Sequence, residues 1–221
     1  MAVIVRTERI LEDGSTATER VYRGFGPPTA KVIQHAERLD KHLSEELPRI
    51  AARLKARGLL KGRRGNRERW YELGKYLQEI VEDPKYVLPE DRRQDQHIWI
   101  AIAQNAPKEL HPGMEVLGAK NIPTKRNHFR LCYQLGRLPK DIVQQHTWRE
   151  WVEILESPAI IDDERIVAWI IKKMGSNKRI ELRPLARGIR QQLKGIYTAA
   201  LSDEELTELL DEVLHEVTSF D

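Results

Sequence analysis

Apolar residues recur every three or four positions along most of the chain, a spacing that predicts a mainly α-helical protein. The longest such run covers residues 29–57, where Thr29 is placed to act as the N-cap. Pro48 lies inside this run and predicts a kink or a division into two helices. Further helices are predicted over residues 67–83, 88–106, 124–137, 138–158 (one or two short helices), 162–175, 185–201 and 203–216.

The first residues follow a different pattern. β-branched residues alternate with charged residues over residues 2–25, and Asp13-Gly14 suits the turn of a β-hairpin. An isolated two-stranded hairpin is only marginally stable in water. The hairpin must therefore lie on the helical body, pair with another chain or grip a ligand, and we expect it to pair with another chain or lie against a partner.

The charges are distributed unevenly, although the net charge of the 221 residues is only +3. Basic residues cluster in residues 53–69, 120–149 and 172–194, whereas residues 201–221 carry many carboxylates and no lysine or arginine. Local fields of this kind decide whether a protein binds a polyanion. The basic clusters favour a nucleic-acid partner, and the acidic end is a solvated helix, a docking helix or a shield for the basic surface.

No motif for catalysis stands out. The sequence has no phosphate-binding glycine loop, no dinucleotide fingerprint and no HExxH motif. Its single cysteine, Cys132, excludes an intramolecular disulfide and a thiolate zinc cluster. The three carboxylates of Asp162, Asp163 and Glu164 lie at the start of a predicted helix, where they interact favourably with the positive end of its dipole. We therefore predict no enzyme, no cofactor and no metal, and the lack of an apolar stretch of about 20 residues predicts no membrane span and a cytoplasmic location.

The segment "EVLGAKNIPTKRNHFRLCYQLG" (residues 115–136) has the ingredients of a helix-turn-helix unit, whose second helix enters a nucleic-acid groove. Gly118 permits the turn, and Thr124 is predicted to cap the second helix and to meet a phosphate. Phe129, Cys132, Tyr133 and Gly136 are predicted to face inward. The predicted contact residues are therefore Thr124, Lys125, Arg126, Asn127 and Arg130. The alternative is a surface helix with a solvated basic face.

Three further arginines are predicted to contact nucleic acid. Arg63, Arg64 and Arg67 lie in a glycine-rich basic segment after the first long helix and would clamp the phosphate backbone. Trp148 and Trp151, by contrast, are spaced like a core pair and are predicted to pack inside the protein rather than stack on bases.

Together these patterns predict a mainly α fold, a helical bundle with a helix-turn-helix-like centre and an N-terminal β-hairpin. Four regions follow: the hairpin (1–26), a helix with its basic linker (27–65), the helix-turn-helix-like domain (66–175), and C-terminal helices with an acidic tail (176–221).

Five segments in this order resemble the helical N-terminal domain of YhcG-like proteins: "RWYELGKYLQEI" (69–80), "KELHPGM" (108–114), "PTKRNHFRLCYQL" (123–135), "HTWREWVEIL" (146–155) and "DERIVAWII" (163–171). The resemblance covers residues 66–175 and is sharpest at the Pro-Gly-Met turn. It implies DNA binding in a mobile-element or phage-defence setting, where a PD-(D/E)XK nuclease domain usually follows. Glu150 stands where the family has a histidine, so no role of that histidine transfers. Residues 176–221 are too few for a nuclease domain.

We therefore expect a nucleic-acid-binding protein, with DNA favoured over RNA, that acts as a non-catalytic subunit or regulator in a bacterial DNA-processing, mobile-element or phage-defence system. The alternative is a helical protein-interaction subunit, in which the hairpin and acidic tail dock a partner and the basic faces are incidental.

Overall fold

The computed structural model describes residues 3–11, 15–23, 29–60, 67–85, 96–110, 122–176 and 180–218. Its elements in chain order are β1 (Val3–Ile10), β2 (Thr16–Arg23), α1 (Ala30–Ala56), α2 (Arg67–Val81), α3 (Gln96–Asn105), η2 (Lys108–Leu110), α4 (Ile122–Gly136), α5 (Lys140–Val143), α6 (Trp148–Leu155), α7 (Pro158–Ile161), α8 (Glu164–Gly175), α9 (Leu182–Gln192), η3 (Thr198–Ala200) and α10 (Asp203–Thr218). The predicted fold class, mainly α with an N-terminal β-hairpin, is confirmed.

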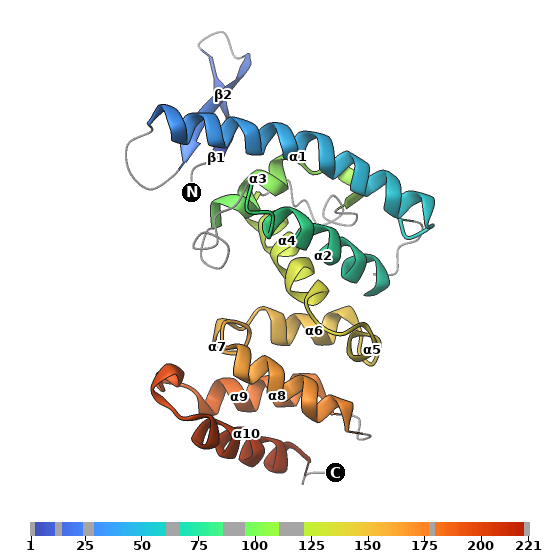
Figure 1. The fold of residues 1–221 in the computed structure, drawn as a ribbon, viewed down its shortest axis with the longest axis vertical. Helices are drawn as coiled ribbons and strands as arrows, with labels where there is room; N and C mark the ends of the chain where they lie inside the picture. The colour runs from blue at the N-terminus through green and yellow to red at the C-terminus, as the bar shows by residue number, and fades with distance from the viewer. Residues whose placement is uncertain are drawn as a thin grey trace.

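The helices form two groups stacked along the long axis of the molecule (Figure 1). We call the hairpin with α1 to α4 the N-terminal lobe, and α5 to α10 the C-terminal lobe. Helix α4 leads from the first lobe into the second (Figure 1). One cluster of buried apolar side chains runs through both lobes, so the lobes share a single core.

Helix α1 continues through Pro48, and the predicted division into two helices is wrong. Proline removes one backbone hydrogen bond from a helix interior. Here Pro48 is exposed, whereas Leu43, Leu47, Ile50 and Leu54 form an unbroken buried stripe on the opposite side. Packing of that stripe holds the helix together across the lost bond. The predicted N-cap is confirmed, because the Thr29 side chain accepts a hydrogen bond from the Val32 N–H.

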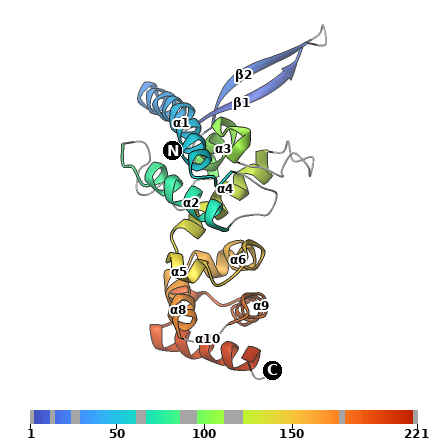
Figure 2. The same ribbon diagram turned by 90° about the vertical axis from the view of Figure 1, so that its right-hand side faces the viewer.

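The hairpin is an antiparallel pair in which Val3 lies opposite Arg23 and Ile10 opposite Thr16. Its Asp13-Gly14 turn lies outside the described residues. The base of the hairpin packs on α1 and α3, and the strands then project away from the helical body (Figure 2). The first possibility raised by the sequence, contact with the helical body, is therefore realised at the base, while pairing with a partner stays a prediction.

A polar network ties β1 to the two helices beneath it. The Arg6 guanidinium donates to both carboxylate oxygens of Asp40, at 3.1 and 2.9 Å. Asn105 joins them, because its Nδ2 donates to Asp40 Oδ1 at 2.9 Å and its Oδ1 accepts from Arg6. The Gln104 side chain pairs with the backbone N–H and carbonyl of Arg6, as a neighbouring strand would. Polar contacts between residues far apart in the chain thus anchor β1 on α1 and α3.

Replacing Asp40 with alanine is expected to lower the free energy of unfolding by about 1–3 kcal/mol, because it leaves the half-buried Arg6 and Asn105 short of an acceptor. The measurement is urea denaturation followed by circular dichroism. Glu45→Ala is the matched control, since Glu45 is exposed on the same helix. We expect the control to change stability by no more than about 0.5 kcal/mol, and equal effects of the two substitutions would contradict the anchoring role.

Helices α2 and α4 cross with their backbones in contact. A Cβ atom added to Gly74 would lie 1.9 Å from the Cys132 carbonyl oxygen, and one added to Gly136 would lie 2.4 Å from the Gly74 carbonyl carbon. Side chains larger than hydrogen do not fit at such distances. The two glycines therefore set how closely α2 approaches α4, the most heavily contacted helix pair of the fold.

The C-terminal lobe differs from the sequence prediction at α7, which was not predicted, and at both ends of α9. Residues 185–201 were predicted as one helix, but α9 ends at Gln192 and a turn follows, with Gly195 at a φ of 82°. Glycine adopts this left-handed conformation without strain, so it ends the helix. The last helix packs on the rest of the lobe, because Leu206, Leu210 and Val213 of α10 are buried against α9 and α8.

Two helices in this lobe begin with a capping side chain. Ser202 and Glu205 form a capping box at α10, since each side chain bonds to the other residue's backbone N–H, at 3.2 and 2.8 Å. Asp163 caps α8 through the Arg165 N–H at 3.0 Å. Over the described ranges, no helix is long and apolar enough to cross a membrane.

Candidate nucleic-acid interface

Helix α4 carries most of the residues that the sequence proposed for nucleic-acid contact. It begins at Ile122, so Thr124 lies in its first turn and the predicted N-cap position is wrong. Pro123 explains the earlier start, because proline suits the first turn of a helix, where N–H groups have no partner. The predicted turn at residues 116–121 and the side chains of Thr124 and Lys125 lie outside what the structure describes.

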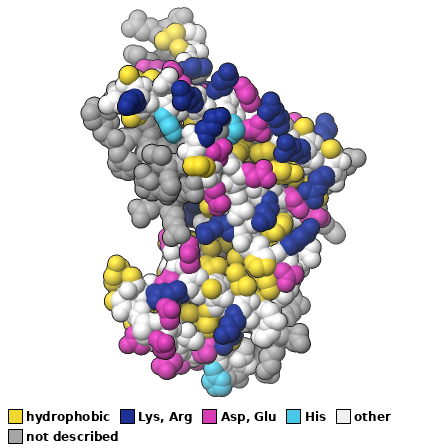
Figure 3. All heavy atoms as spheres, viewed as in Figure 1, with side chains coloured by type: hydrophobic (Ala, Val, Ile, Leu, Met, Phe, Trp, Pro, Cys, Tyr) yellow, Lys and Arg dark blue, Asp and Glu magenta, His cyan; other side chains and the backbone are white. Residues whose placement is uncertain are grey.

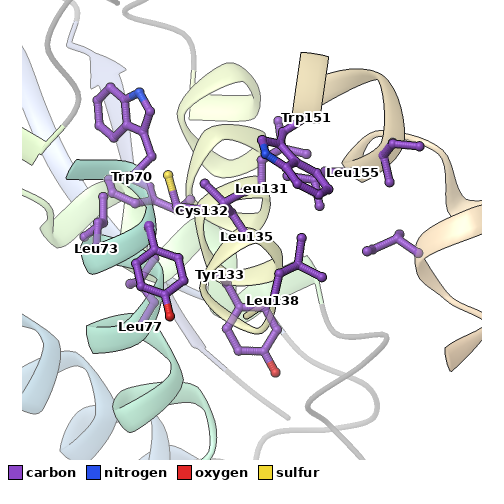
Figure 4. Close-up of a cluster of buried hydrophobic side chains, with 14 of the residues drawn as sticks. Trp70, Leu73, Leu77, Leu131, Cys132, Tyr133, Leu135, Leu138, Trp151 and Leu155 are labelled. Carbon is purple, nitrogen blue, oxygen red and sulfur yellow. The ribbon is translucent and has the colours of Figure 1, made fainter. Parts of the chain in front are cut away.

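The inward face predicted for α4 is confirmed: Phe129, Cys132, Tyr133 and Gly136 are buried. A second face, which the sequence did not predict, is buried as well. Figure 4 shows α4 between two sets of apolar side chains, with Leu73 and Leu77 of α2 on one side and Trp151 and Leu155 of α6 on the other. Leu131 and Leu135 face this second set. The accessible part of α4 is therefore its N-terminal half.

Three predicted contact residues with described side chains lie in that half, and each is half-buried: Arg126, Asn127 and Arg130. Asn127 Nδ2 donates to Glu156 Oε1 at 3.3 Å, and Arg130 donates to Asn127 Oδ1 at the same distance. The first bond joins α4 to the end of α6, and the second lies within α4. Contact with a phosphate or a base edge would have to compete with them, whereas Arg126 makes no hydrogen bond or ion pair with another described residue and is the freest of the three.

An aromatic cluster lies beside these residues. The His128 ring meets Trp70 of α2 edge to face at 4.5 Å, and Trp148 of α6 lies 5.8 Å from His128 and 5.9 Å from Trp70. Trp148 packs on the core and Trp151 is fully buried, with its Nε1 donating to the Val143 carbonyl at 3.1 Å. The prediction that the tryptophans pack inside is confirmed for Trp151, whereas Trp148 packs against the core but is only partly buried. The cluster holds three helices together and leaves few aromatic faces for bases.

Cys132 lies below this cluster, with its Sγ 3.5 Å from His128 Nε2. Burial raises the pKa of the Cys132 thiol well above its ordinary value. The thiol therefore stays protonated at neutral pH and does not act as a nucleophile. Across the residues described, no group of three or more histidine, cysteine, aspartate or glutamate side chains is placed to hold a metal ion.

The three predicted clamp arginines lie close together in sequence but are only partly visible. Arg63 and Arg64 lie outside the described residues, and Arg67 opens α2 with its side chain undescribed. Helix α1, which precedes them, carries further basic side chains. Arg49, Arg53, Lys55 and Arg57, at the C-terminal end of α1, are all exposed. We call these four residues the cationic end of α1.

The cationic end of α1 belongs to a stretch of chain that is rich in positive charge and has no carboxylate. After Glu46 the chain has no carboxylate until Glu68, and in between it carries Arg49, Arg53, Lys55, Arg57, Lys61, Arg63, Arg64 and Arg67. Lysine and arginine side chains gather along α1 and α2 on the face shown in Figure 3. Only the last three of these arginines were predicted from the sequence to contact nucleic acid. The long stretch without a carboxylate was the signal that could have identified the others.

Neighbouring groups orient part of this surface. Arg57 bonds to Glu72 of α2 at 2.7 Å, and Lys140 of α5 lies 3.7 Å from the same carboxylate. The hydrogen bond from Arg57 lowers the pKa of Glu72, which stays ionised. The Arg53 guanidinium lies over the Tyr76 ring, 5.7 Å from its centroid. Arg57 is thus engaged within the protein, whereas Arg53 and Lys55 make no ion pair with any described residue.

Comparisons of the chain with protein-family models, with curated proteins and with solved structures found no match. What the protein does must therefore be inferred from the chemistry of its surface.

Proposed function

We propose that this protein binds nucleic acid without catalysing a reaction on it, and that DNA is its preferred ligand. The observation that carries the proposal is the cationic end of α1: four exposed lysine and arginine side chains in a stretch of chain that has no carboxylate between Glu46 and Glu68. Such a surface attracts phosphates independently of sequence, by neutralising them and releasing their counterions. Arginine adds forked, two-pronged hydrogen bonding to phosphate oxygens.

The two basic regions have different chemistry for this task. The cationic end of α1 suits contact with the phosphate backbone, which positions a protein but carries no sequence information. Arg126, Asn127 and Arg130 of α4 are of the types that also bond to base edges. Their half-burial and their link to Glu156 favour a supporting role, in which α1 supplies most of the affinity.

The biological setting follows from the resemblance of residues 66–175 to the helical N-terminal domain of YhcG-like proteins. We propose that the protein is a non-catalytic subunit or regulator of a bacterial DNA-processing, mobile-element or phage-defence system. The alternative is a protein-interaction subunit without nucleic-acid contact, which the exposed apolar loop described below favours.

Fluorescence anisotropy with duplex DNA, single-stranded DNA and structured RNA tests the proposal. A footprint of about four to six phosphates predicts that affinity falls by roughly two to three decades between about 50 and 200 mM salt. Binding to none of the three ligands at about 100 mM salt would sink the proposal and leave the protein-interaction alternative.

Charge reversal at the cationic end of α1 identifies the surface. The double variant Arg53→Glu, Lys55→Glu is expected to weaken binding to all sequences alike and to make the salt slope shallower by about two units. Lys31→Glu, at the exposed opposite end of α1, is the control and should bind as the parent does. If the two variants lose affinity equally, net charge and not this surface governs binding.

The α4 residues are tested in parallel. Arg126→Ala and Arg130→Ala are each expected to make the salt slope shallower by about one unit if they contact phosphates, and to cost about 1–3 kcal/mol on a preferred site only if they contact bases. Parent-like binding by both variants on every ligand would remove α4 from the interface.

A further inference from the structure

The loop between α9 and α10, residues 193–202, exposes more apolar surface than its neighbours. Tyr197 is 77% exposed and Ile196 is 38% exposed, and Leu11 is the other large apolar side chain of comparable exposure among the described residues. Tyrosine is enriched among the side chains that dominate binding energy at protein interfaces. An aromatic ring held this far out of the core gains nothing from folding, so it calls for an explanation outside the monomer.

This loop is held in one conformation by Arg165 of α8. The Arg165 guanidinium donates to the carbonyls of Thr198 and Leu201, at 2.8 and 2.9 Å. The same group bonds to Asp163 at 2.9 and 3.2 Å, and to Asp203 at 3.2 Å. Because the backbone on the C-terminal side of Tyr197 is fixed in this way, little conformational entropy is lost when the loop meets a partner.

Negative charge borders the loop. Asp162 lines an open cleft beside it, together with Thr198 and Ala199. Asp203 and Glu204 follow the loop directly and are exposed. Lys194, at the start of the loop, is the one cation in residues 193–205. A partner that covers Ile196 and Tyr197 must therefore combine apolar or aromatic surface with positive charge.

The chain itself carries such a surface, at the cationic end of α1. The exposed Ala52 and Ala56 lie among its cations, and the half-buried Tyr76 ring lies under Arg53. A tyrosine ring packs well on small apolar side chains and binds arginine or lysine through its face. The two surfaces lie in different lobes, on opposite sides of the view in Figure 1, so they cannot meet within one molecule.

We propose that the protein associates head to tail, with the loop around Tyr197 of one copy seated on the cationic end of α1 of the next. The contact joins two different surfaces, so it is heterologous: a pair of molecules still has one free loop and one free cationic end, and the assembly grows into a ring or a filament. Salt weakens it, because screening acts on its exposed charge pairs. The inference does not depend on nucleic-acid binding, since it concerns the protein alone.

A complementation experiment tests this arrangement. One variant, Ile196→Ser with Tyr197→Ser, loses the loop surface, and the other, Arg53→Glu with Lys55→Glu, loses the cationic surface. The substituted side chains are exposed, so both variants should keep the circular dichroism spectrum of the parent. Light scattering after size-exclusion chromatography, at high protein concentration and low salt, gives the mass of each species.

We expect the parent to form species larger than a dimer, and each variant alone to be a monomer. An equimolar mixture of the two variants should give a dimer and nothing larger, because each contributes the one surface that the other lacks. Lys31→Glu and Glu212→Lys, which reverse exposed charges elsewhere, should assemble as the parent does.

Three results would overturn the proposal. They are a parent that stays monomeric, a variant that still assembles alone, and a mixture of the two variants that stays monomeric. None of them bears on nucleic-acid binding, which is measured by anisotropy at dilute protein. There the loop variant should bind like the parent. A protein that assembles as proposed but binds no nucleic acid would contradict the proposed function and leave head-to-tail association standing.

Discussion

Gly74→Ala is expected to abolish the native fold, or to lower the free energy of unfolding by more than about 4–5 kcal/mol, a range that few single substitutions reach. The new Cβ would lie 1.9 Å from the Cys132 carbonyl oxygen and 2.8 Å from the Gly136 nitrogen. Both atoms belong to the backbone of α4, so no side-chain rotation relieves the clash. Helices α2 and α4 would have to separate and open the core between them. Urea denaturation and the dispersion of amide NMR signals measure the effect.

The sign of this result separates tertiary packing from helix propensity. Alanine is a better helix former than glycine by about 1 kcal/mol, so an unpacked glycine in a helix is improved by the same change. Gly175→Ala is the matched control, because a Cβ at Gly175, at the end of α8, meets no atom within 4 Å. We expect the control to be neutral or stabilising by up to about 1 kcal/mol. A tolerated Gly74→Ala would show that α2 and α4 are farther apart than described.

Trp151→Ala is expected to lower the free energy of unfolding by about 3–5 kcal/mol, because it opens a large cavity in a fully buried site. Trp151 is 1% exposed and lies where the C-terminal lobe meets α4, next to Leu138, Ile154 and Leu155. Figure 4 places its ring beside the leucines of α4. Loss of the ring therefore weakens the shared core between the lobes. Urea denaturation measures the stability, and a broadened or two-step transition would reveal that the lobes then unfold separately.

Trp151→Phe separates the contribution of apolar packing to stability from that of the Trp151 hydrogen bond. Phenylalanine keeps most of the apolar volume but cannot donate the hydrogen bond that Trp151 Nε1 makes to the Val143 carbonyl at 3.1 Å. The lost bond alone costs about 1–3 kcal/mol if the carbonyl is left without a partner. We therefore expect Trp151→Phe to be less destabilising than Trp151→Ala, and equal effects of the two substitutions would mean that the hydrogen bond, not packing, is the main contribution of this side chain.

The buried faces of helix α4 could be predicted from the sequence only in part. Its spacing correctly placed Phe129, Cys132 and Tyr133 inside, since residues three and four apart share a face. The pattern did not reveal that Leu131 and Leu135 are also buried, because two adjoining apolar faces blur a single stripe. The helix is therefore covered on two sides, and the surface available to a nucleic acid is smaller than a free recognition helix would offer.

The main candidate interface is the cationic end of α1 and not α4, and packing again explains why the sequence did not reveal it. The sequence identified the basic segment around Arg63 and Arg64 from its composition. Charge alone could not say that α1 stays helical through Pro48 and carries Arg49, Arg53 and Lys55 outward on one continuous helix. That outcome depends on the packing of the opposite face against the core.

By itself the sequence determined what is settled within one helical turn or one strand pair: the helical class, the hairpin, the cap at Thr29, and most inward faces. These features follow from local hydrogen bonds and from the periods of helix and strand. Tertiary structure alone decided the contact of Gly74 with Gly136, the anchoring of Arg6 by Asp40 and Asn105, and the exposure of Tyr197. Each depends on how residues far apart in the chain approach one another, and that geometry is set by the packing of whole helices.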